Sequence, residues 1–424
     1  MSRIKSLQVF VLIIIAGVVG YYFGINNVNL SWKNYKPTVT VVNKEAPTAL
    51  TTVDFSNFWT VWEKLEANYY DKTKIDSTKM LNGAIEGMVQ SLGDPFTMYL
   101  PPVQNTGFKD QLAGQFSGIG AELGTKDNQI IVIAPLTGSP AEKAGVKAGD
   151  LILKVDEEST QNWTLPTTVN KIRGPKGTSV TLTIYHKDAE KPQDVKIVRD
   201  VITVKSVDGW VKAAKDIEAI KVPKDQKGSV AYIRLSQFGD ATNKDWSAVV
   251  NKIFLQMQQE KDIKGLIIDL RNNPGGYLTD AVFIASEFLK QGSTVVMEED
   301  GQKVRTSLSV ERKGLLQDIP LWVLINKGSA SASEIVSGAL RDNKLNGKSR
   351  ALLVGDISFG KGTVQEADDL GNGAGLHVTI AKWLTPNGTW VHGKGLTPDI
   401  QVALDPKDPS HDTQLEKAVL EMLK

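Results

Sequence analysis

The chain has 424 residues, of which 41% are hydrophobic and 23% charged, so it has the composition of a folded protein and the length of two or three domains. Its net charge is +1 and no basic block is long enough to follow a nucleic-acid backbone, which excludes nucleic-acid binding. It has no cysteine, which excludes thiol catalysis, disulfides and zinc sites built on thiolates. Candidates for a histidine base are few, because the sequence holds only His186, His377, His392 and His411.

Residues 1–25 have the pattern of a membrane anchor. Arg3 and Lys5 precede an uncharged apolar run from Leu7 to Ile25, and about twenty such residues in a helix span the ~30 Å hydrocarbon core. The two basic residues should stay in the cytoplasm, which predicts that the rest of the chain is tethered outside it, in the periplasm or the extracellular space. A cleaved signal peptide is the alternative, but the run is long and no A-x-A-like site ends it.

Residues 26–52 are polar and have no helical period, so we expect a linker there. Residues 53–102 are expected to form a small helical unit, because apolar residues recur at three- and four-residue steps. The aromatic stripe of its first helix, which starts at Phe55, is more typical of a packing surface than of a cofactor site. Together with the helix expected at 413–424, it suggests pairing of two copies in a homodimer.

Residues 103–200 combine short strands with two short helices in about a hundred residues. Strands are expected at 117–123 ("SGIGAEL") and 129–135 ("QIIVIAP"), and 139–145 ("SPAEKAG") opens a helix with Ser139 as its N-cap. Further strands, in which apolar and polar residues alternate, are expected on either side of the second helix. The whole segment resembles a PDZ domain.

In that resemblance, "SGIGAEL" corresponds to the carboxylate-binding loop and the strand beside the peptide groove. It implies that a peptide adds as a further strand to a sheet edge, while backbone amides of Gly118, Ile119 and Gly120 bind its terminal carboxylate. The expected partners are therefore proteins or peptides with free, apolar C-termini. The alternative is that the two glycines merely form a tight turn.

From residue 201 to 424, apolar strands alternate with amphipathic helices, which predicts a largely parallel sheet covered by helices. Buried strands are expected at 229–235, 265–270, 320–326 and 351–355. Functional sites of such sheets gather at the carboxyl ends of the strands. Three loops follow those ends: "RNNPGG" (271–276), "NKGSASASE" (326–334) and "GDISFGKGT" (355–363).

The second of these loops is a tight strand-to-helix turn, which lifts a serine off the sheet and points helix-start amides at the group it attacks. The pattern alone leaves Ser329, Ser331 and Ser333 open as the nucleophile. A serine hydroxyl is a poor nucleophile at neutral pH and needs an adjacent base. His377 and His392 lie in a strand-like segment and a glycine-rich turn, where we expect ordinary packing or surface residues.

The third loop differs from a phosphate-binding loop by one residue, since Gly362 stands where that motif needs a hydroxyl ligand for Mg²⁺. Nucleotide binding is therefore a weak alternative, and Lys361 is the better candidate for the serine's base. That role requires an uncharged amine, hence a pKa well below that of a free lysine. We expect burial among Phe359 and apolar strand residues to lower it. Gly360 and Gly362 would let the backbone press the amine against the serine.

Four stretches, together with the PDZ-like segment between them, resemble the C-terminal processing peptidases, which are tail-specific serine proteases. The resemblance covers residues 55–424. It implies an α/β protease core of the crotonase and Clp-protease kind, a mostly parallel sheet with covering helices, joined to an inserted PDZ domain and the small helical N-terminal unit. The stretches are "SLGDPFTMY" (91–99), "IIDLRNNPGG" (267–276), "NKGSASASEIVSGALRD" (326–342) and "FGKGTVQ" (359–365).

The resemblance also implies roles for individual residues. Ser331, the middle serine of "SASAS", matches the nucleophile, Lys361 matches the general base, and Gln365 matches the residue that orients the lysine amine. The resemblance further implies an oxyanion hole formed by the N–H of Ala332 and one N–H from Gly275 or Gly276. Removing one donor of such a hole typically costs ~3–4 kcal/mol of transition-state stabilisation.

Two further positions match the family pattern less directly. Arg173 resembles a residue near the protease junction and would couple peptide binding to the active site, whereas Asp342 matches an acidic position with an expected structural role. The sequence therefore predicts a membrane-anchored serine endopeptidase that recognises protein C-termini and cleaves near them, without metal or other cofactor. The alternative is a catalytically inactive scaffold that binds C-termini through its PDZ-like domain.

Overall fold

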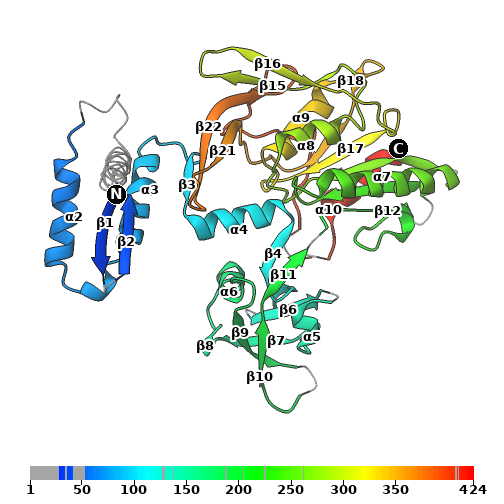
Figure 1. Cartoon of the computed structure of the whole chain (residues 1–424). Coiled ribbons are helices and arrows are strands. Elements are labelled where there is room, and N and C mark those ends of the chain that lie inside the picture. Colours follow the sequence, from blue (N-terminus) through cyan, green and yellow to red (C-terminus); the bar gives the residue numbers. More distant parts are fainter. Residues whose placement is uncertain are drawn as a thin grey trace, which may run out of the picture. The chain divides into compact units, whose positions relative to one another are not determined.

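The computed structural model describes residues 28–33, 36–41, 53–126, 129–136, 138–186, 189–203, 205–223, 226–260, 262–405, 408 and 410–424 (Figure 1). The chain divides into two compact units at residue 80, and each is described by itself. The anchor predicted at 1–25 lies outside the described residues. Within the described part, no helix is long and apolar enough to cross a membrane.

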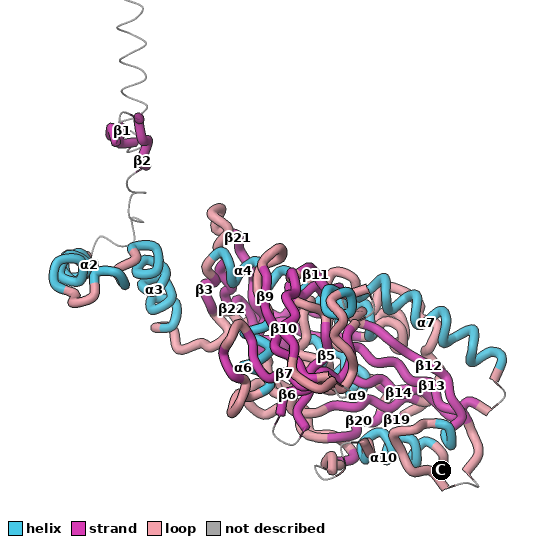
Figure 2. Tube along the Cα trace, turned by 90° about the horizontal axis from the view of Figure 1, so that it is seen from below, coloured by secondary structure: helices cyan, strands magenta, loops and turns pink. Residues whose placement is uncertain are grey.

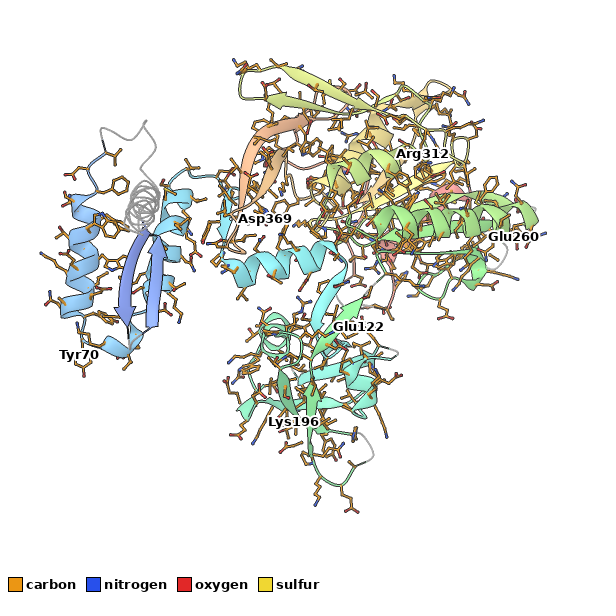
Figure 3. The ribbon with its side chains drawn as sticks, viewed as in Figure 1. Tyr70, Glu122, Lys196, Glu260, Arg312 and Asp369 are labelled. Atoms are coloured by element: carbon orange, nitrogen blue, oxygen red, sulfur yellow. The ribbon has the colours of Figure 1, made fainter. Side chains whose placement is uncertain are left out.

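The first unit contains a β-hairpin and a helix rich in aromatic residues. The hairpin lies within the segment 26–52, where a linker was expected; its second strand contains the alternating β-branched run at 38–41, which suits a strand. On the helix, Trp59 is 55% exposed, and Tyr70 just beyond it is 99% exposed (Figure 3). The elements are β1 (Val28–Lys33), β2 (Lys36–Val41), α2 (Ser56–Asn68) and the 3₁₀ helix η2 (Lys72–Lys74).

The second unit begins within α3 (Ser77–Gln90), which is followed by β3 (Met98–Leu100) and α4 (Pro102–Leu112). The helix α4 is fixed at the end of a strand far along the chain, β21 (Thr363–Asp369). Lys109 forms an ion pair of 2.6 Å with Asp369, which Figure 3 labels, and Asn105 donates to the carbonyl of Gly373. Helix α4 is thereby held against the end of β21.

The PDZ-like segment forms a twisted antiparallel sheet with the strand order β10-β9-β7-β6-β5, and β8 pairs with β7. The edge strand β5 is accompanied by helix α6. Ser139 caps helix α5 by accepting a hydrogen bond from the N–H of Glu142, as its position predicts. The elements are β4 (Gln115–Gly118), β5 (Ala121–Lys126), β6 (Gln129–Pro135), α5 (Pro140–Lys143), β7 (Leu151–Val155), β8 (Glu158–Ser159), α6 (Leu165–Ile172), β9 (Ser179–Tyr185), β10 (Gln193–Val198) and β11 (Asp200–Thr203).

The core contains the predicted parallel sheet, with the strand order β12-β13-β14-β17-β20-β23. All neighbours from β13 to β23 are parallel, and β12 adds an antiparallel edge that the sequence pattern did not predict. This confirms the predicted fold class of the core. The strands are β12 (Val207–Ala213), β13 (Ser229–Leu235), β14 (Ile263–Asp269), β17 (Leu321–Ile325), β20 (Leu352–Gly355) and β23 (Ile400–Gln401), and the 3₁₀ helix η3 (Ala214–Asp216) follows β12.

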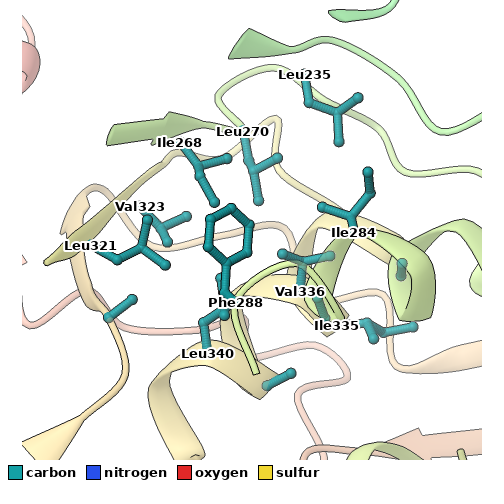
Figure 4. Packing of buried hydrophobic residues seen from close by; sticks show 14 of the residues in the cluster. Leu235, Ile268, Leu270, Ile284, Phe288, Leu321, Val323, Ile335, Val336 and Leu340 are labelled. Carbon is teal, nitrogen blue, oxygen red and sulfur yellow. The ribbon is translucent and has the colours of Figure 1, made fainter. Parts of the chain in front are cut away.

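Helices cover both faces of this sheet, because alternate residues of each strand point to opposite sides. In β14, Leu266 and Ile268 enter the larger hydrophobic cluster, whereas Ile267 enters the cluster on the other face. Figure 4 shows the first cluster, with strand residues packed against helix residues such as Ile284 and Val336. In Figure 2, α7 and α10 lie on opposite sides of the strands. The covering helices are α7 (Thr242–Gln259), α8 (Leu278–Ala285) and α9 (Ala332–Asp342) on one face and α10 (Thr413–Met422) on the other.

A second, antiparallel sheet stands beside the first, with the order β16-β15-β22-β21 and β3 paired to β22. The sequence reading did not predict it as a separate sheet. A tight hairpin, β18 (Lys344–Leu345) and β19 (Lys348–Ser349), follows α9, and it turns at Asn346 and Gly347 with positive φ. The remaining strands are β15 (Thr294–Asp300), β16 (Arg305–Ser309) and β22 (Gly375–Leu384).

Candidate active site

The three loops singled out in the sequence follow β14, β17 and β20, which are direct neighbours in the parallel sheet. Their carboxyl ends therefore meet at one edge, as the topology predicts. There they border a cavity of about 280 Å³. Ser331, Lys361 and Gln365 all line this cavity, and so do Gly275 and Gly276. Phe96 and His377 contribute to its wall from outside the three loops.

Ser331 occupies the strand-to-helix turn, directly before α9, with φ 54° and ψ −114°. A non-glycine residue rarely adopts this conformation. Such backbone strain is typical of the serine in a nucleophile elbow, where a sharp strand-to-helix turn exposes the hydroxyl. The two neighbouring serines differ from it, because both are fully buried and their hydroxyls are in use. Ser329 donates to the carbonyl of Leu270 and Ser333 to that of Asn273.

Glu334 joins the serine turn to the lysine loop, although sequence reasoning gave it no role. Its carboxylate is fully buried and accepts hydrogen bonds from the N–H of Ser331 at 2.9 Å and of Lys361 at 2.9 Å. It also accepts from the N–H of Gly360 and the hydroxyl of Ser358. Four donors from two loops thus converge on one buried carboxylate, which fixes the two loops relative to each other.

Lys361 lies between this carboxylate and an aromatic ring. Its carbonyl accepts from the indole of Trp383, and its Nζ stands 5.0 Å from the centre of the Phe96 ring. Burial lowers the pKa of Lys361, and the nearby negative charge of Asp94 acts in the opposite direction. The expectation that Phe359 buries the amine is wrong, since Phe359 is 56% exposed. Phe96, which lies 265 positions earlier in the sequence, takes that place.

No hydrogen bond joins Lys361 Nζ to Ser331 Oγ or to Gln365 among the described residues. Gln365 instead donates from Nε2 to the hydroxyls of Thr363, at 2.9 Å, and Thr379, at 3.0 Å. The three residues share the cavity, but the amine rests against Phe96 rather than on the serine hydroxyl.

The loop after β14 approaches the serine closely. A Cβ at Gly275 would lie 2.9 Å from the Cβ of Ser331 and 3.0 Å from the N of Ala332, so only glycine fits there. Ala332 is the first residue of α9, and its N–H therefore has no partner within the helix. The N–H of Gly275 donates to the side chain of the buried Asn273, which leaves Gly276 as the other candidate of the expected pair.

Histidines lie near the site without a direct bond to the serine. His377 is buried, lines the cavity and packs edge-on against Phe108, and both burial and the charge of Lys361 lower its pKa. His392 stacks on Trp390. The pattern in the sequence indicated ordinary packing or surface roles for both, and it did not reveal that His377 lines the cavity.

The resemblance of the third loop to a phosphate-binding loop has a structural answer. A phosphate loop offers its backbone N–H groups to the ligand, but those of Gly360 and Lys361 already donate to Glu334. The protein's own carboxylate thus takes the place of an anion. Among the described residues, no group of three or more acidic or histidine side chains could hold a metal ion.

A second cavity, of about 350 Å³, lies in the PDZ-like sheet between edge strand β5 and helix α6. Gly118, Ile119 and Gly120 line it, as does Arg173. The Arg173 guanidinium lies 4.8 Å from the ring centre of Phe116. Phe116 belongs to β4, which pairs with β11 where the chain enters and leaves the segment. The expected carboxylate loop and the expected coupling residue are therefore neighbours.

Asp342 accepts a hydrogen bond from the N–H of Asn387 and lies at the far end of α9 from Ser331. The residues that sequence reasoning missed are Glu334, Asn273 and Phe96. Only Glu334 had a local signal, because it stands three residues after Ser331, at the spacing of a capping box. Asn273 bonds locally to Gly275, but its contacts with Leu235 and Ser333, like the contact of Phe96 with Lys361, join chain segments that are distant in the sequence.

Comparison with known proteins matches three parts of the chain to families. Residues 229–402 match peptidase family S41, residues 131–185 match the PDZ domain, and residues 14–102 match the N-terminal domain of the activating protease CtpB. The matched regions follow the order helical unit, PDZ-like segment and core.

Curated relatives match over most of the chain. A carboxy-terminal-processing protease of Bartonella bacilliformis is 38% identical over 369 residues, which is 86% of this chain and 79% of the relative. The carboxy-terminal processing protease CtpB of Bacillus subtilis is 36% identical over 390 residues, 91% of this chain and 75% of the relative.

Solved structures agree with this assignment. The photosystem II D1 C-terminal processing protease is 29% identical with a TM-score of 0.50, and the match covers 85% of this chain and 95% of that one. A putative S41 protease from Bacteroides fragilis, 16% identical, shares the fold with a TM-score of 0.54, over 85% of this chain and 96% of that one. The chain therefore belongs to the carboxy-terminal processing proteases of peptidase family S41 and carries a PDZ domain.

Proposed function

We propose that this chain is a membrane-anchored serine endopeptidase that reads the C-terminus of a protein with its PDZ domain and cleaves near it by a Ser-Lys-Gln mechanism. The observation that carries the proposal is that one cavity is lined both by Ser331, in a strained turn at a helix start, and by Lys361, whose amine is partly desolvated. Ser329 and Ser333 are unsuited to the role because they are buried and hydrogen-bonded.

In this mechanism Ser331 Oγ attacks the scissile carbonyl while the uncharged Lys361 amine takes the hydroxyl proton. The lysine then protonates the leaving amine, and water hydrolyses the acyl-enzyme. The N–H groups of Ala332 and Gly276 would stabilise the oxyanion. In the resting arrangement the amine lies on Phe96, so it has to swing to the serine hydroxyl when the substrate enters. Gln365 would hold it there.

The PDZ domain supports tail recognition by its open edge. Among the described strands, β5 pairs with β6 alone, so a peptide can add to its other side in the groove beside α6. The carbonyls of Ile119 and Gly120 accept hydrogen bonds from the N–H groups of Ala141 and Leu136, which fixes the turn whose amides would bind the carboxylate. Arg173 would transmit occupancy of this groove to the core.

Anchoring rests on the apolar run before residue 26 and its two preceding basic residues, which would leave the catalytic part outside the cytoplasm. The exposed aromatic residues of α2 suit a surface that pairs two copies in a homodimer. Membrane fractionation of the full chain and of a version that starts at residue 53 tests the anchor. Equal release of both into the soluble fraction would refute it.

Tail recognition predicts that cleavage depends on the last residues of the substrate. Peptides with identical cleavage regions and an apolar C-terminus should be cut at least about 10-fold faster than the same peptides with a C-terminal amide, because the amide removes the charge that the Gly118–Gly120 turn binds. Mass spectrometry of the products gives both rate and cleavage site. Equal rates for acid and amide would refute tail recognition, whereas no cleavage of any peptide would favour the inactive scaffold.

The position of Glu334 leads to a prediction about the active-site loops. Glu334→Gln replaces one acceptor oxygen by an NH₂ group that faces backbone N–H donors, so we expect kcat to fall about 10- to 100-fold. Glu366→Gln, on the exposed side of β21, is the matched control and should change little. Steady-state kinetics of both variants, with thermal unfolding to confirm folding, decide the matter; an unaffected Glu334→Gln enzyme would contradict the role given to this carboxylate.

A further inference from the structure

Gln365 is held by two threonines of the antiparallel sheet. It lies on β21 directly opposite Thr379 of β22 in the strand register. Its Nε2 donates one hydrogen bond to the Thr379 hydroxyl, at 3.0 Å, and one to the Thr363 hydroxyl, at 2.9 Å. Both donor positions of the amide are therefore engaged, and its oxygen is the end that remains for another partner in the cavity shared with Lys361.

The orientation of the Gln365 amide depends on Asp94, which acts on it through Thr379. The carboxylate of Asp94 accepts hydrogen bonds from the N–H of Phe96, at 3.0 Å, and from the hydroxyl of Thr97, at 2.7 Å. A hydrogen-bonding interaction with the Thr379 hydroxyl also lowers the pKa of Asp94. Burial raises the pKa of Asp94, but these hydrogen bonds together with the charge of His392 outweigh it and keep the carboxyl ionised. An ionised carboxylate can only accept, so the Thr379 hydroxyl must donate to it.

The direction of this hydrogen bond from Thr379 to Asp94 decides the orientation of the Gln365 amide. With its proton directed to Asp94, the Thr379 oxygen can only accept from the Gln365 amide, so the NH₂ group must face Thr379. A reversed amide would place its oxygen against the Thr379 oxygen without a proton between them. It would also offer N–H groups to the lone pair of the lysine amine, the same lone pair that must take the serine's proton.

The turn at residues 94–97 also contacts the lysine itself. The ring of Phe96 lies under Lys361 Nζ, and the Thr97 hydroxyl accepts from the N–H of Thr379, at 3.0 Å. One turn, which lies before the PDZ domain in the sequence, is thus connected both to the amine and to the strand residue that orients Gln365.

We propose that Asp94 and Thr379 are positioning residues of the peptidase, which hold the Gln365 amide with its oxygen available as the acceptor for the Lys361 amine. This inference rests on the proposed function, since it concerns the same reaction. Neither residue lines the cavity; both act through Gln365, and Asp94 acts in addition through its charge on Lys361.

The test compares Thr379→Val with Thr379→Ser in the full chain. The valine variant loses the hydroxyl and should lower kcat about 10- to 100-fold with little change in KM, because the base is misplaced while substrate binding remains. The serine variant keeps the hydroxyl and should recover near-normal kcat. Thr306→Val, on the exposed strand β16, is the matched control. A Thr379→Val enzyme with normal kcat, or a serine variant as slow as the valine one, overturns the proposal.

Asp94→Asn supplies an independent readout, the pH dependence of kcat/KM. Three titratable groups bear on the lysine: Asp94 raises the pKa of Lys361, His377 interacts with its charge, and His392 lies beside Phe96 and interacts with Asp94. Removal of the Asp94 charge should therefore move the acid limb of the profile to lower pH, which a merely structural defect would not do. An unmoved limb contradicts the role of Asp94.

The wild-type enzyme separates this proposal from the proposed function. If the wild type cleaves the peptide and Ser331→Ala does not, the function stands and the threonine and aspartate variants test the positioning alone. If the wild type and Ser331→Ala are equally inactive, the proposed function fails, and with it the reaction that Asp94 and Thr379 would serve.

Discussion

Ser331→Ala is expected to abolish peptide cleavage, with a loss of kcat of roughly 10⁴- to 10⁶-fold, because the Ser331 hydroxyl is the group that forms the acyl-enzyme in the proposed mechanism. The neighbouring hydroxyls cannot substitute, since those of Ser329 and Ser333 are buried and already donate to carbonyls. A discontinuous assay with product detection by mass spectrometry has the range that this loss requires. Ser307→Ala, at an exposed position of β16, should keep full activity.

The same variant distinguishes the peptidase from an inactive scaffold. Ser331→Ala should still bind a peptide with an apolar C-terminus, because the PDZ groove lies in another sheet with its own core. Fluorescence anisotropy of a labelled peptide measures this binding. A Ser331→Ala enzyme that cleaves at a rate close to that of the wild type would remove the serine from the mechanism.

Lys361→Met is expected to have the second large effect, a loss of kcat of at least about 10³-fold, since the hydroxyl is left without a base. Methionine keeps an unbranched side chain that can pack against Phe96, so the fold of the site should survive. Lys344→Met, on the exposed strand β18, is the control for the loss of a positive charge.

Thermal unfolding should show similar stability for both lysine variants, which separates a catalytic defect from a folding defect. Retention of near-normal turnover in Lys361→Met would show that another group accepts the proton. His377 would then be the next candidate, because it lines the same cavity and burial favours its neutral form.

Much of the core fold could be predicted from the sequence because its strands are buried on both faces and read as continuous apolar runs. The strand β13 has the bounds that were expected, 229–235, and β14 and β17 differ from expectation by one or two residues at their ends. The antiparallel sheet could not be assigned in the same way. Strand β21, for example, is exposed over its last four residues and contains three acidic ones, so its composition does not mark a strand.

The location of the candidate site could be predicted from the sheet topology, because the site lies at the carboxyl ends of neighbouring strands. Loops after neighbouring parallel strands must meet, which placed the serine, lysine and glycine loops together without any knowledge of side-chain contacts. The environment of the lysine amine did not follow. Phe359 is adjacent in sequence but exposed, whereas Phe96 reaches the amine through β3, which pairs with β22. Only the tertiary fold brings these segments together.

The central claim is that Lys361 acts as an uncharged base, and the pH dependence of kcat/KM of the wild-type enzyme tests it most directly. Activity should rise with pH as the amine loses its proton, with a half-maximum clearly below the ordinary lysine pKa of 10.5, because burial lowers the pKa of Lys361. A profile with its half-maximum at or above that value, or one that does not change between about pH 5 and about pH 10, would contradict the account.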